Sequence, residues 1–215
     1  YSFLNGNYPE PQLLPNGQLD PLDTSDETPV DTWGHGTHVA GIVVGSGAAS
    51  NGDYRGIATA AELVSLRVLD ENGSGNASDL VAALDWVLEY KDAFNIKVVN
   101  MSLGMSPMPP AAQDPLVQAA EAVWDAGVVV LAAAGNLGWN GNFTIHSPGT
   151  SRKVITVGSL TDNGTGGDYS DDYVSTFSSR GPTSFDLFLK PDLVAPGNKI
   201  VAPIPETAGL RSILS

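Results

Sequence analysis

Asp31-Thr-Trp-Gly-His-Gly-Thr-His-Val-Ala-Gly41 sets two histidines among glycines, and the apolar residues 39–44 follow directly. An imidazole has an unperturbed pKa near neutrality, so either His35 or His38 can take up and return a proton at physiological pH. Glycines on both sides of His35 let the backbone pass close to another group. The pattern therefore predicts that His35 begins a helix and faces a cleft, and that residues 39–44 give this helix a buried side.

Other interpretations of this segment are open. Zinc could bind His35 and His38, but a metalloprotease helix places its histidines four residues apart with a glutamate between them, and neither condition is met. Gly45-Ser-Gly47 could open a dinucleotide-binding turn, but the third glycine of that fingerprint is absent and Asn51-Gly52 would interrupt the helix. Either histidine could also be a polar residue that is satisfied inside a packed turn.

Length, charge and composition exclude several classes of protein. A chain of 215 residues can form one domain with a sizeable core. A net charge of −14 would be repelled by phosphates, so no nucleic-acid partner is expected. The chain has no apolar run of about 18 residues, so no membrane partner is expected, and Tyr1 to Pro9 lack the basic start and apolar core of a secretory signal. Without cysteines there are neither disulfides nor thiolate metal sites.

From residue 57 onward, apolar runs typical of strands alternate with amphipathic segments typical of helices. The expected strands are residues 62–69, 96–101, 128–134, 154–158 and 193–195. The run over residues 128–134 is apolar throughout, which indicates a strand buried on both faces. Alternating strands and helices predict an α/β fold with a mainly parallel sheet, whose sites lie beyond the carboxyl ends of the strands.

Two helices are expected between these strands. Ser78 can cap the first helix. The residues that this helix would bury on one face are Leu80, Leu84, Val87 and Leu88. Asp114 can cap the second helix, with Pro115 at its first position and Gly127 just past its end. The buried side of the second helix would comprise Leu116, Ala120 and Val123.

Polar residues directly follow two of the predicted strands, in Asn100-Met-Ser-Leu-Gly104 and in Ala132-Ala-Ala-Gly-Asn136. The carboxyl ends of parallel strands lie at one edge of a sheet, so both groups are expected beside the same cleft. An amide just past a buried strand can donate a hydrogen bond to an oxyanion that forms on an acyl carbon. Alternatively, Asn136 only turns the chain, as asparagine after glycine often does.

The histidine stretch, Gly34-His-Gly-Thr-His-Val-Ala-Gly41, resembles the histidine motif of the subtilisin-like serine proteases, the subtilases. Met101-Ser-Leu-Gly104 and Ala132-Ala-Ala-Gly-Asn136 are similar to the substrate-binding and oxyanion motifs of the same family, and they follow in the family's order. The resemblance implies that His35 is the general base and that His38 is a structural, hydrogen-bonded neighbour. It also implies that Asn136 donates to the oxyanion.

The same resemblance implies how a substrate binds. An extended polypeptide would add to the sheet as a further strand. The residues that would offer it backbone groups are Ser102, Leu103 and Gly104. The small residues that would wall the pocket for the residue before the cut bond are Ala133, Ala134 and Gly135. His146 is expected either near the floor of that pocket or in water as a loop histidine.

Further segments extend the resemblance over residues 33–197. They are Ser147-Pro-Gly149, Lys153-Val-Ile-Thr-Val-Gly158, Thr176-Phe-Ser-Ser-Arg-Gly-Pro182 and Lys190-Pro-Asp-Leu-Val-Ala-Pro-Gly197, and they are most similar to the AprX-type branch of the family. The implied fold is the three-layer subtilisin-like α/β fold, with a mainly parallel central sheet flanked by helices. Residues 1–215 would form a single partial peptidase domain, with a surface connection over 1–33, a core over 34–197 and a final segment over 198–215.

Two motifs of the family's Ser-His-Asp triad are not found in the sequence. The aspartate normally ends an apolar strand and precedes Thr-Gly. No such strand precedes any of the candidates, which are Asp20, Asp23, Asp26 and Asp31. The nucleophile normally lies in Gly-Thr-Ser-Met-Ala, which does not occur, and Ser212 and Ser215 have no helix to open. We therefore expect a serine endopeptidase domain that is incomplete at both ends and inactive by itself; a noncatalytic peptide-binding relative is the alternative.

Ser102 could instead be the nucleophile of an α/β-hydrolase with His146 as its base, but Asn100 stands where the elbow Gly-x-Ser-x-Gly needs its first glycine. The expected serine-protease chemistry requires no cofactor. A structural calcium ion would suit the family, but the carboxylates of residues 162–172 match no calcium-loop spacing, so its site is unknown. The expected partner is an extended polypeptide substrate. The complete protein is expected to be a monomer, extracellular rather than cytoplasmic.

Overall fold

The computed structural model describes residues 1–6, 8–11, 31–165 and 167–210 of a chain that forms two compact units. The first unit comprises residues 1–83 and 201–215, and the second comprises residues 84–200. His35 belongs to the first unit, whereas the predicted substrate-binding and oxyanion residues belong to the second. Of the residues singled out from the sequence, those that lie outside the described part of the chain are Asp20, Asp23, Asp26, Ser212 and Ser215.

The first unit has little regular structure besides its helices. These are α1 (His35–Val44), the short 3₁₀ helices η1 (Leu4–Gly6) and η2 (Ala48–Ser50), and the start of α2 (Ala77–Tyr90). The strand predicted over residues 62–69 is wrong: in the described chain only Arg67 forms a bridge, to Ser2. An apolar, β-branched run favours extended backbone, but a strand also needs a neighbouring strand of similar length, and a single bridge does not supply one.

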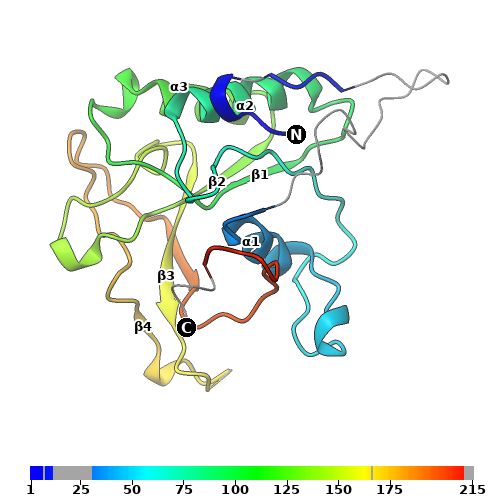
Figure 1. Ribbon diagram of the computed structural model, residues 1–215. Coiled ribbons are helices and arrows are strands. Elements are labelled where there is room, and N and C mark those ends of the chain that lie inside the picture. The colour runs from blue at the N-terminus through cyan, green and yellow to red at the C-terminus, as the bar shows by residue number, and fades with distance from the viewer. Residues whose placement is uncertain (7, 12–30, 166, 211–215) are drawn as a thin grey trace. The chain divides into compact units, whose positions relative to one another are not determined.

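Helix α1 has no fully buried residue, so the buried side predicted over residues 39–44 is also wrong. Within its own unit the helix is covered by the irregular segment of residues 203–208, which Figure 1 shows in red beside α1. This contact is close, because a side chain at Gly41 would lie 2.4 Å from Pro203. A single irregular segment covers only a narrow strip of a helix, so the apolar side chains of α1 stay partly exposed.

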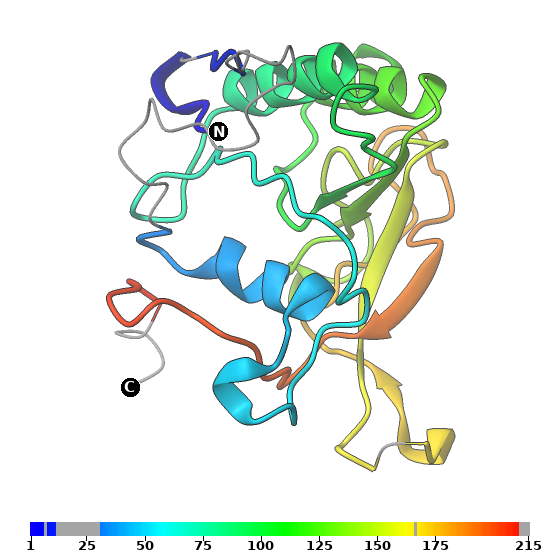
Figure 2. The same cartoon turned by 90° about the vertical axis from the view of Figure 1, so that its right-hand side faces the viewer.

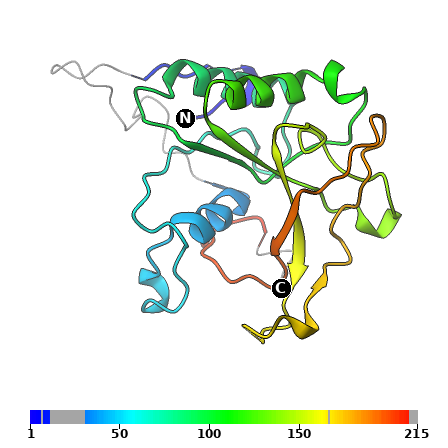
Figure 3. The ribbon, with the colours of Figure 1, turned by 180° about the vertical axis from the view of Figure 1, so that it is seen from behind.

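The second unit is built on a five-stranded sheet in which β1, β2 and β3 are neighbours and β3 also pairs with β4 and β5 (Figure 3). The strands are β1 (Val98–Met101), β2 (Val129–Ala133), β3 (Ile155–Thr161), β4 (Tyr173–Val174) and β5 (Leu193–Pro196). The pairs β1–β2, β2–β3 and β3–β5 are parallel, and β3–β4 is antiparallel. The predicted α/β class with a mainly parallel sheet is therefore confirmed.

Strand β2 is fully buried on one face only, not on both as its apolar sequence predicted. Val130 and Ala132 are buried, whereas Val129 is 40% exposed. Successive strand residues point to opposite faces of the sheet. Helix α3 (Pro115–Asp125) packs against β2 (Figure 2). An apolar run predicts that a strand is buried, but not how many layers cover it.

The first of the two predicted helices is α2 (Ala77–Tyr90). It begins one residue before Ser78, so Ser78 is not its cap. The preceding residue is Asn76, whose carbonyl accepts the backbone N–H of Asp79 at 3.2 Å. Of the residues predicted to face the core, Leu80, Leu84 and Val87 are buried and Leu88 is half-buried. The remaining 3₁₀ helices are η3 (Ala111–Gln113), η4 (Gly138–Asn140) and η5 (Tyr169–Asp171).

Helix α3 begins as predicted. The Asp114 carboxylate accepts the backbone N–H of Leu116 at 2.9 Å and of Val117 at 3.5 Å, and Pro115 occupies the first helical position. Gly127, just past the helix end, has a φ of 88°, which glycine adopts without strain. The predicted buried side is also present, as Leu116, Ala120 and Val123.

Replacing Asp114 with alanine is expected to lower the free energy of unfolding by about 1 kcal/mol, because two N–H groups of a buried helix end lose their acceptor. Asp114→Asn keeps an acceptor oxygen and should cost much less. Urea denaturation followed by circular dichroism measures both variants. Equal losses from alanine and asparagine would contradict the capping role.

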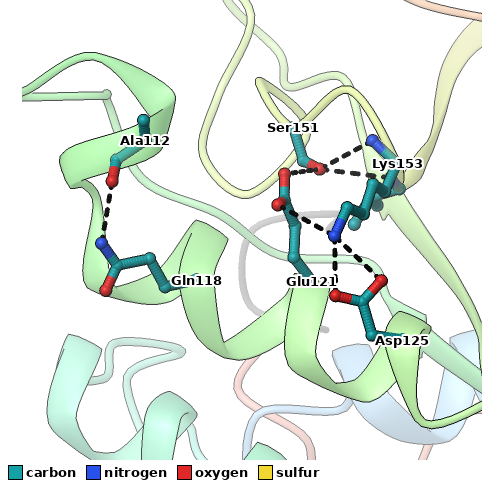
Figure 4. A network of polar contacts seen from close by, with 7 residues as sticks. Ala112, Gln118, Glu121, Asp125, Ser151 and Lys153 are labelled. Carbon is teal, nitrogen blue, oxygen red and sulfur yellow. Dashed lines mark hydrogen bonds and ion pairs between the residues drawn. The ribbon is translucent and has the colours of Figure 1, made fainter.

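A polar network links α3 to the turn that precedes β3 (Figure 4). The Ser151 hydroxyl donates to Glu121 at 2.7 Å and accepts the backbone N–H of Lys153 at 3.0 Å. The Lys153 ammonium lies 2.7 Å from Asp125, and this hydrogen bond raises the pKa of Lys153. Exposed ion pairs stabilise proteins by less than about 1 kcal/mol, so the network orients the start of β3 more than it stabilises the fold.

Candidate active site

His35 is the first residue of α1, so its predicted place at a helix N-terminus is confirmed. Gly34 precedes it with a φ of 102°, a left-handed conformation that glycine adopts readily, and a side chain at Gly34 would collide with Ala208. The His35 side chain is partly exposed, and its predicted role as general base requires such access. His38 donates its backbone N–H to the Gly34 carbonyl at 3.1 Å, and its structural role stays a prediction.

Asp31 caps this helix. One carboxylate oxygen accepts the N–H of Gly34 at 2.7 Å, and the other accepts the N–H of Thr37 at 2.7 Å and its hydroxyl at 2.8 Å. Partial burial by itself would raise the pKa of Asp31, but these hydrogen bonds outweigh burial and lower it. The sequence marks Asp31 only as a triad candidate, so its capping role was missed. The available signal was an aspartate, Asp31, four residues before the first residue of the predicted helix.

Asn136 lies just past the carboxyl end of β2, in the second unit, where it was predicted. Gly135 before it has a φ of 110°, which lets the chain turn at the end of the strand. Ser179 holds this turn, because its N–H donates to the Gly135 carbonyl at 2.9 Å and its hydroxyl accepts the N–H of Leu137 at 3.0 Å. The Asn136 side chain is exposed and has no hydrogen-bond partner among the described residues, so its amide is free to donate.

The predicted peptide-binding segment, residues 102–104, continues past the end of β1. The Asn100 amide donates to the Ser102 hydroxyl at 2.9 Å. The backbone N–H and C=O groups of Leu103 and Gly104 make no hydrogen bond to any residue that the structure describes. Unpaired backbone groups of this kind can pair with a substrate peptide in an extended conformation, which then adds to the sheet as a strand.

The three small residues predicted to wall the pocket do not have equal access to it. The side chain of Ala134 is buried, and its backbone is fully used: its N–H donates to Val157 at 2.8 Å and its carbonyl accepts the N–H of His146 at 2.9 Å. Ala133 is partly exposed, and so is the backbone of Gly135. Ala133 and Gly135 can therefore line a pocket, whereas Ala134 holds their position.

The α/β-hydrolase alternative does not fit the structure. A nucleophile elbow is a sharp turn between a strand and a helix, so a helix must follow the serine directly. Ser102 follows β1, but the next α-helix, α3, begins only at Pro115. Ser102 therefore lies in a long connection and not in an elbow.

Within the described residues, no group of three or more histidine, cysteine, aspartate or glutamate side chains is arranged to hold a metal ion. In the acidic turn, the pKa of Asp172 is raised by partial burial and then by the charges of Asp171, Asp162 and Asp168. This turn gives no location for the expected calcium ion. Every helix in the described part of the chain is too short or too polar to cross a lipid bilayer.

Known proteins are similar to this chain in sequence. A family model described as the subtilase family matches residues 7–213. Serine protease AprX of Bacillus subtilis (strain 168) is 45% identical over 204 residues, which are 92% of this chain and 45% of that protein. The extracellular serine proteinase of Thermus sp. (strain Rt41A) is 38% identical over 172 residues, which are 80% of this chain and 34% of that protein.

Solved structures are also similar. The S41 psychrophilic protease superposes with a TM-score of 0.67 at 34% sequence identity, and the match covers 83% of this chain and 57% of that one. The chain therefore spans about half the length, or less, of the known proteins to which it is similar.

Proposed function

Because the chain belongs to the subtilase family, we propose that it forms part of a serine endopeptidase that hydrolyses peptide bonds through a Ser-His-Asp triad. The observation that carries the proposal is the free amide of Asn136, held on a fixed turn just past β2. An amide in this position can donate to the oxyanion that forms when a nucleophile attacks a peptide carbonyl. His35 is proposed as the general base that takes the proton from the serine.

The proposed substrate is a peptide chain that binds in an extended conformation. Its backbone would pair with the unpaired N–H and C=O groups of Leu103 and Gly104, and the residue before the cut bond would lie beside Ala133 and Gly135. This arrangement binds any sequence through its backbone and leaves selectivity to the pocket. The proposed chemistry proceeds through protons and acyl transfer alone and requires no cofactor.

The family match over residues 7–213 also supports the proposal that both units belong to one peptidase domain. A location outside the cytoplasm is proposed because one relative is itself named an extracellular proteinase. The net charge of −14 supports a polypeptide rather than a nucleic-acid partner, and we propose that the complete enzyme acts as a monomer.

The proposed function is tested with two polypeptides. One is the 215-residue chain. The other, called the extended polypeptide, joins residues 1–215 to segments that carry a subtilase aspartate motif and serine motif. The extended polypeptide is expected to hydrolyse a chromogenic peptide and to be inactivated by phenylmethanesulfonyl fluoride, which sulfonylates an activated serine. The 215-residue chain is expected to show no turnover.

Two results would contradict the proposal. Peptide binding without turnover by the extended polypeptide would favour a noncatalytic relative. Turnover by the 215-residue chain that is lost in His35→Ala would show that the nucleophile lies within residues 1–215.

A further inference from the structure

His146 lies where the two proposed substrate-binding segments meet. Its backbone N–H donates to the Ala134 carbonyl at 2.9 Å, which ties it to the end of β2. The next residue, Ser147, exchanges two backbone hydrogen bonds with Met105, at 3.1 and 2.9 Å, which ties it to the end of the 102–104 segment. These bonds place His146 between a segment that would bind the substrate backbone and one that would line its pocket.

The two glycines of these segments leave room for His146. A Cβ atom at Gly135 would lie 2.8 Å from Cγ and 3.0 Å from Cδ2 of the imidazole ring. A Cβ atom at Gly104 would lie 3.2 Å from the Cβ atom of His146. Such distances are shorter than ordinary carbon–carbon contacts, so the His146 side chain occupies space that side chains at these positions would otherwise fill.

One nitrogen of the ring has no partner. The Nε2 atom of His146 is buried and makes no hydrogen bond within the described part of the chain, although the residue as a whole is partly exposed. A buried polar atom without a partner destabilises a protein, because it has lost its hydrogen bonds to water and gained none in return. A ligand group that supplied a hydrogen bond to the ring would recover part of this cost.

The two segments that His146 contacts, residues 102–105 and 133–135, contain no charged residue. A charged residue nearby in the fold is Arg180, whose backbone pairs with Thr144, two residues before His146. Burial is the only cause that lowers the pKa of His146, and no neighbouring charge contributes. The imidazole is therefore the one titratable group among these segments that a substrate side chain would meet.

We infer that His146 determines selectivity in the pocket beside Ala133 and Gly135, and that it favours a substrate whose residue before the cut bond is acidic. The inference rests on the proposed function, because it assigns a substrate class to the same site. A glutamate side chain in this pocket would bring a carboxylate that accepts a hydrogen bond from an imidazole N–H. Protonation of the ring adds a charge pair to this bond.

The direction of the pH effect follows from this charge pair. Burial lowers the pKa of His146 in the free enzyme, so the ring is neutral at pH 8. A bound carboxylate favours the imidazolium and raises that pKa again. Preference for glutamate over glutamine must therefore grow as the pH falls through the pKa of His146.

The test compares two substrates of the extended polypeptide that differ only by glutamate or glutamine before the cut bond. The ratio of their kcat/KM values is measured between pH 5.5 and pH 8, and any ionisation that affects both substrates equally cancels in this ratio. In the wild type the glutamate-to-glutamine ratio is expected to rise as the pH falls from 8 to 5.5, by up to about tenfold for a pKa change of about one unit. His146→Phe keeps a ring in the same space without nitrogen atoms, and its ratio should not change with pH.

A second measurement uses only the wild type, so it does not depend on whether a variant folds. The Hε1 proton resonance of His146 in the wild-type extended polypeptide reports its pKa by NMR titration. A product analogue ending in glutamate amide should raise this pKa by about one unit, whereas the matched peptide ending in glutamine amide should not.

The outcomes separate the two proposals. A wild type that hydrolyses both substrates with a ratio independent of pH would overturn the role of His146 and leave the proposed function standing. The same pH dependence in His146→Phe would assign the effect to another group and would also overturn it. An extended polypeptide with no peptidase activity at all would overturn both.

Discussion

Replacing His35 with alanine in the extended polypeptide is expected to lower kcat by about 10⁶, because the serine hydroxyl then has no group to accept its proton. This magnitude is the one known for loss of the catalytic histidine in subtilisin, and it is carried over from that enzyme. Residual turnover would come from substrate binding and from the oxyanion donor, which do not depend on the base. KM should change little if binding relies mainly on the second unit.

Steady-state kinetics on a chromogenic peptide measure this effect, with circular dichroism to check the fold. His38→Ala is the matched control, because it removes a second imidazole from the same helix without removing the proposed base. Its kcat should stay within about tenfold of the wild type, or roughly 1.4 kcal/mol. Equal losses in the two variants would contradict the assignment of His35 as the base and would point to damage of helix α1.

Elements that depend on local chemistry were predictable from the sequence. Helix α3 has a cap at Asp114, a proline at its first position and a glycine past its end, and each signal acts within one turn of the residues that it organises. Elements that depend on distant partners were not. Residues 62–69 have the composition of a strand but have no neighbouring strand of matching length, and composition does not reveal the neighbour.

The candidate site shows the same division. The position of Asn136 follows from a buried strand that ends one turn earlier, so a local pattern predicts it. The contact of His146 with Gly135 depends on hydrogen bonds between residues that are 12 and 42 positions apart, from His146 to Ala134 and from Ser147 to Met105. No local pattern encodes such bonds, which is why the sequence left His146 between a pocket and open water.

Asn136→Leu in the extended polypeptide is expected to lower kcat by about 10² to 10³ while KM barely changes. Leucine has nearly the shape of asparagine but cannot donate a hydrogen bond. The bond in question strengthens only as negative charge develops on the carbonyl oxygen, so its loss destabilises the transition state more than the bound substrate. The magnitude, roughly 2.7 to 4 kcal/mol, is that of the corresponding change in subtilisin and is likewise carried over.

The side chain of Ser102 provides the control for this variant, since both residues follow strand ends in the second unit. The proposed role of residues 102–104 uses their backbone, so Ser102→Ala should keep kcat within about tenfold, and the lost bond to Asn100 should appear only as a small loss of stability. A folded Ser102→Ala enzyme without activity would instead make Ser102 the nucleophile and Asn136 a mere turn residue. A rise in KM with unchanged kcat in Asn136→Leu would likewise remove Asn136 from the transition state, because only uniform binding would then have been lost.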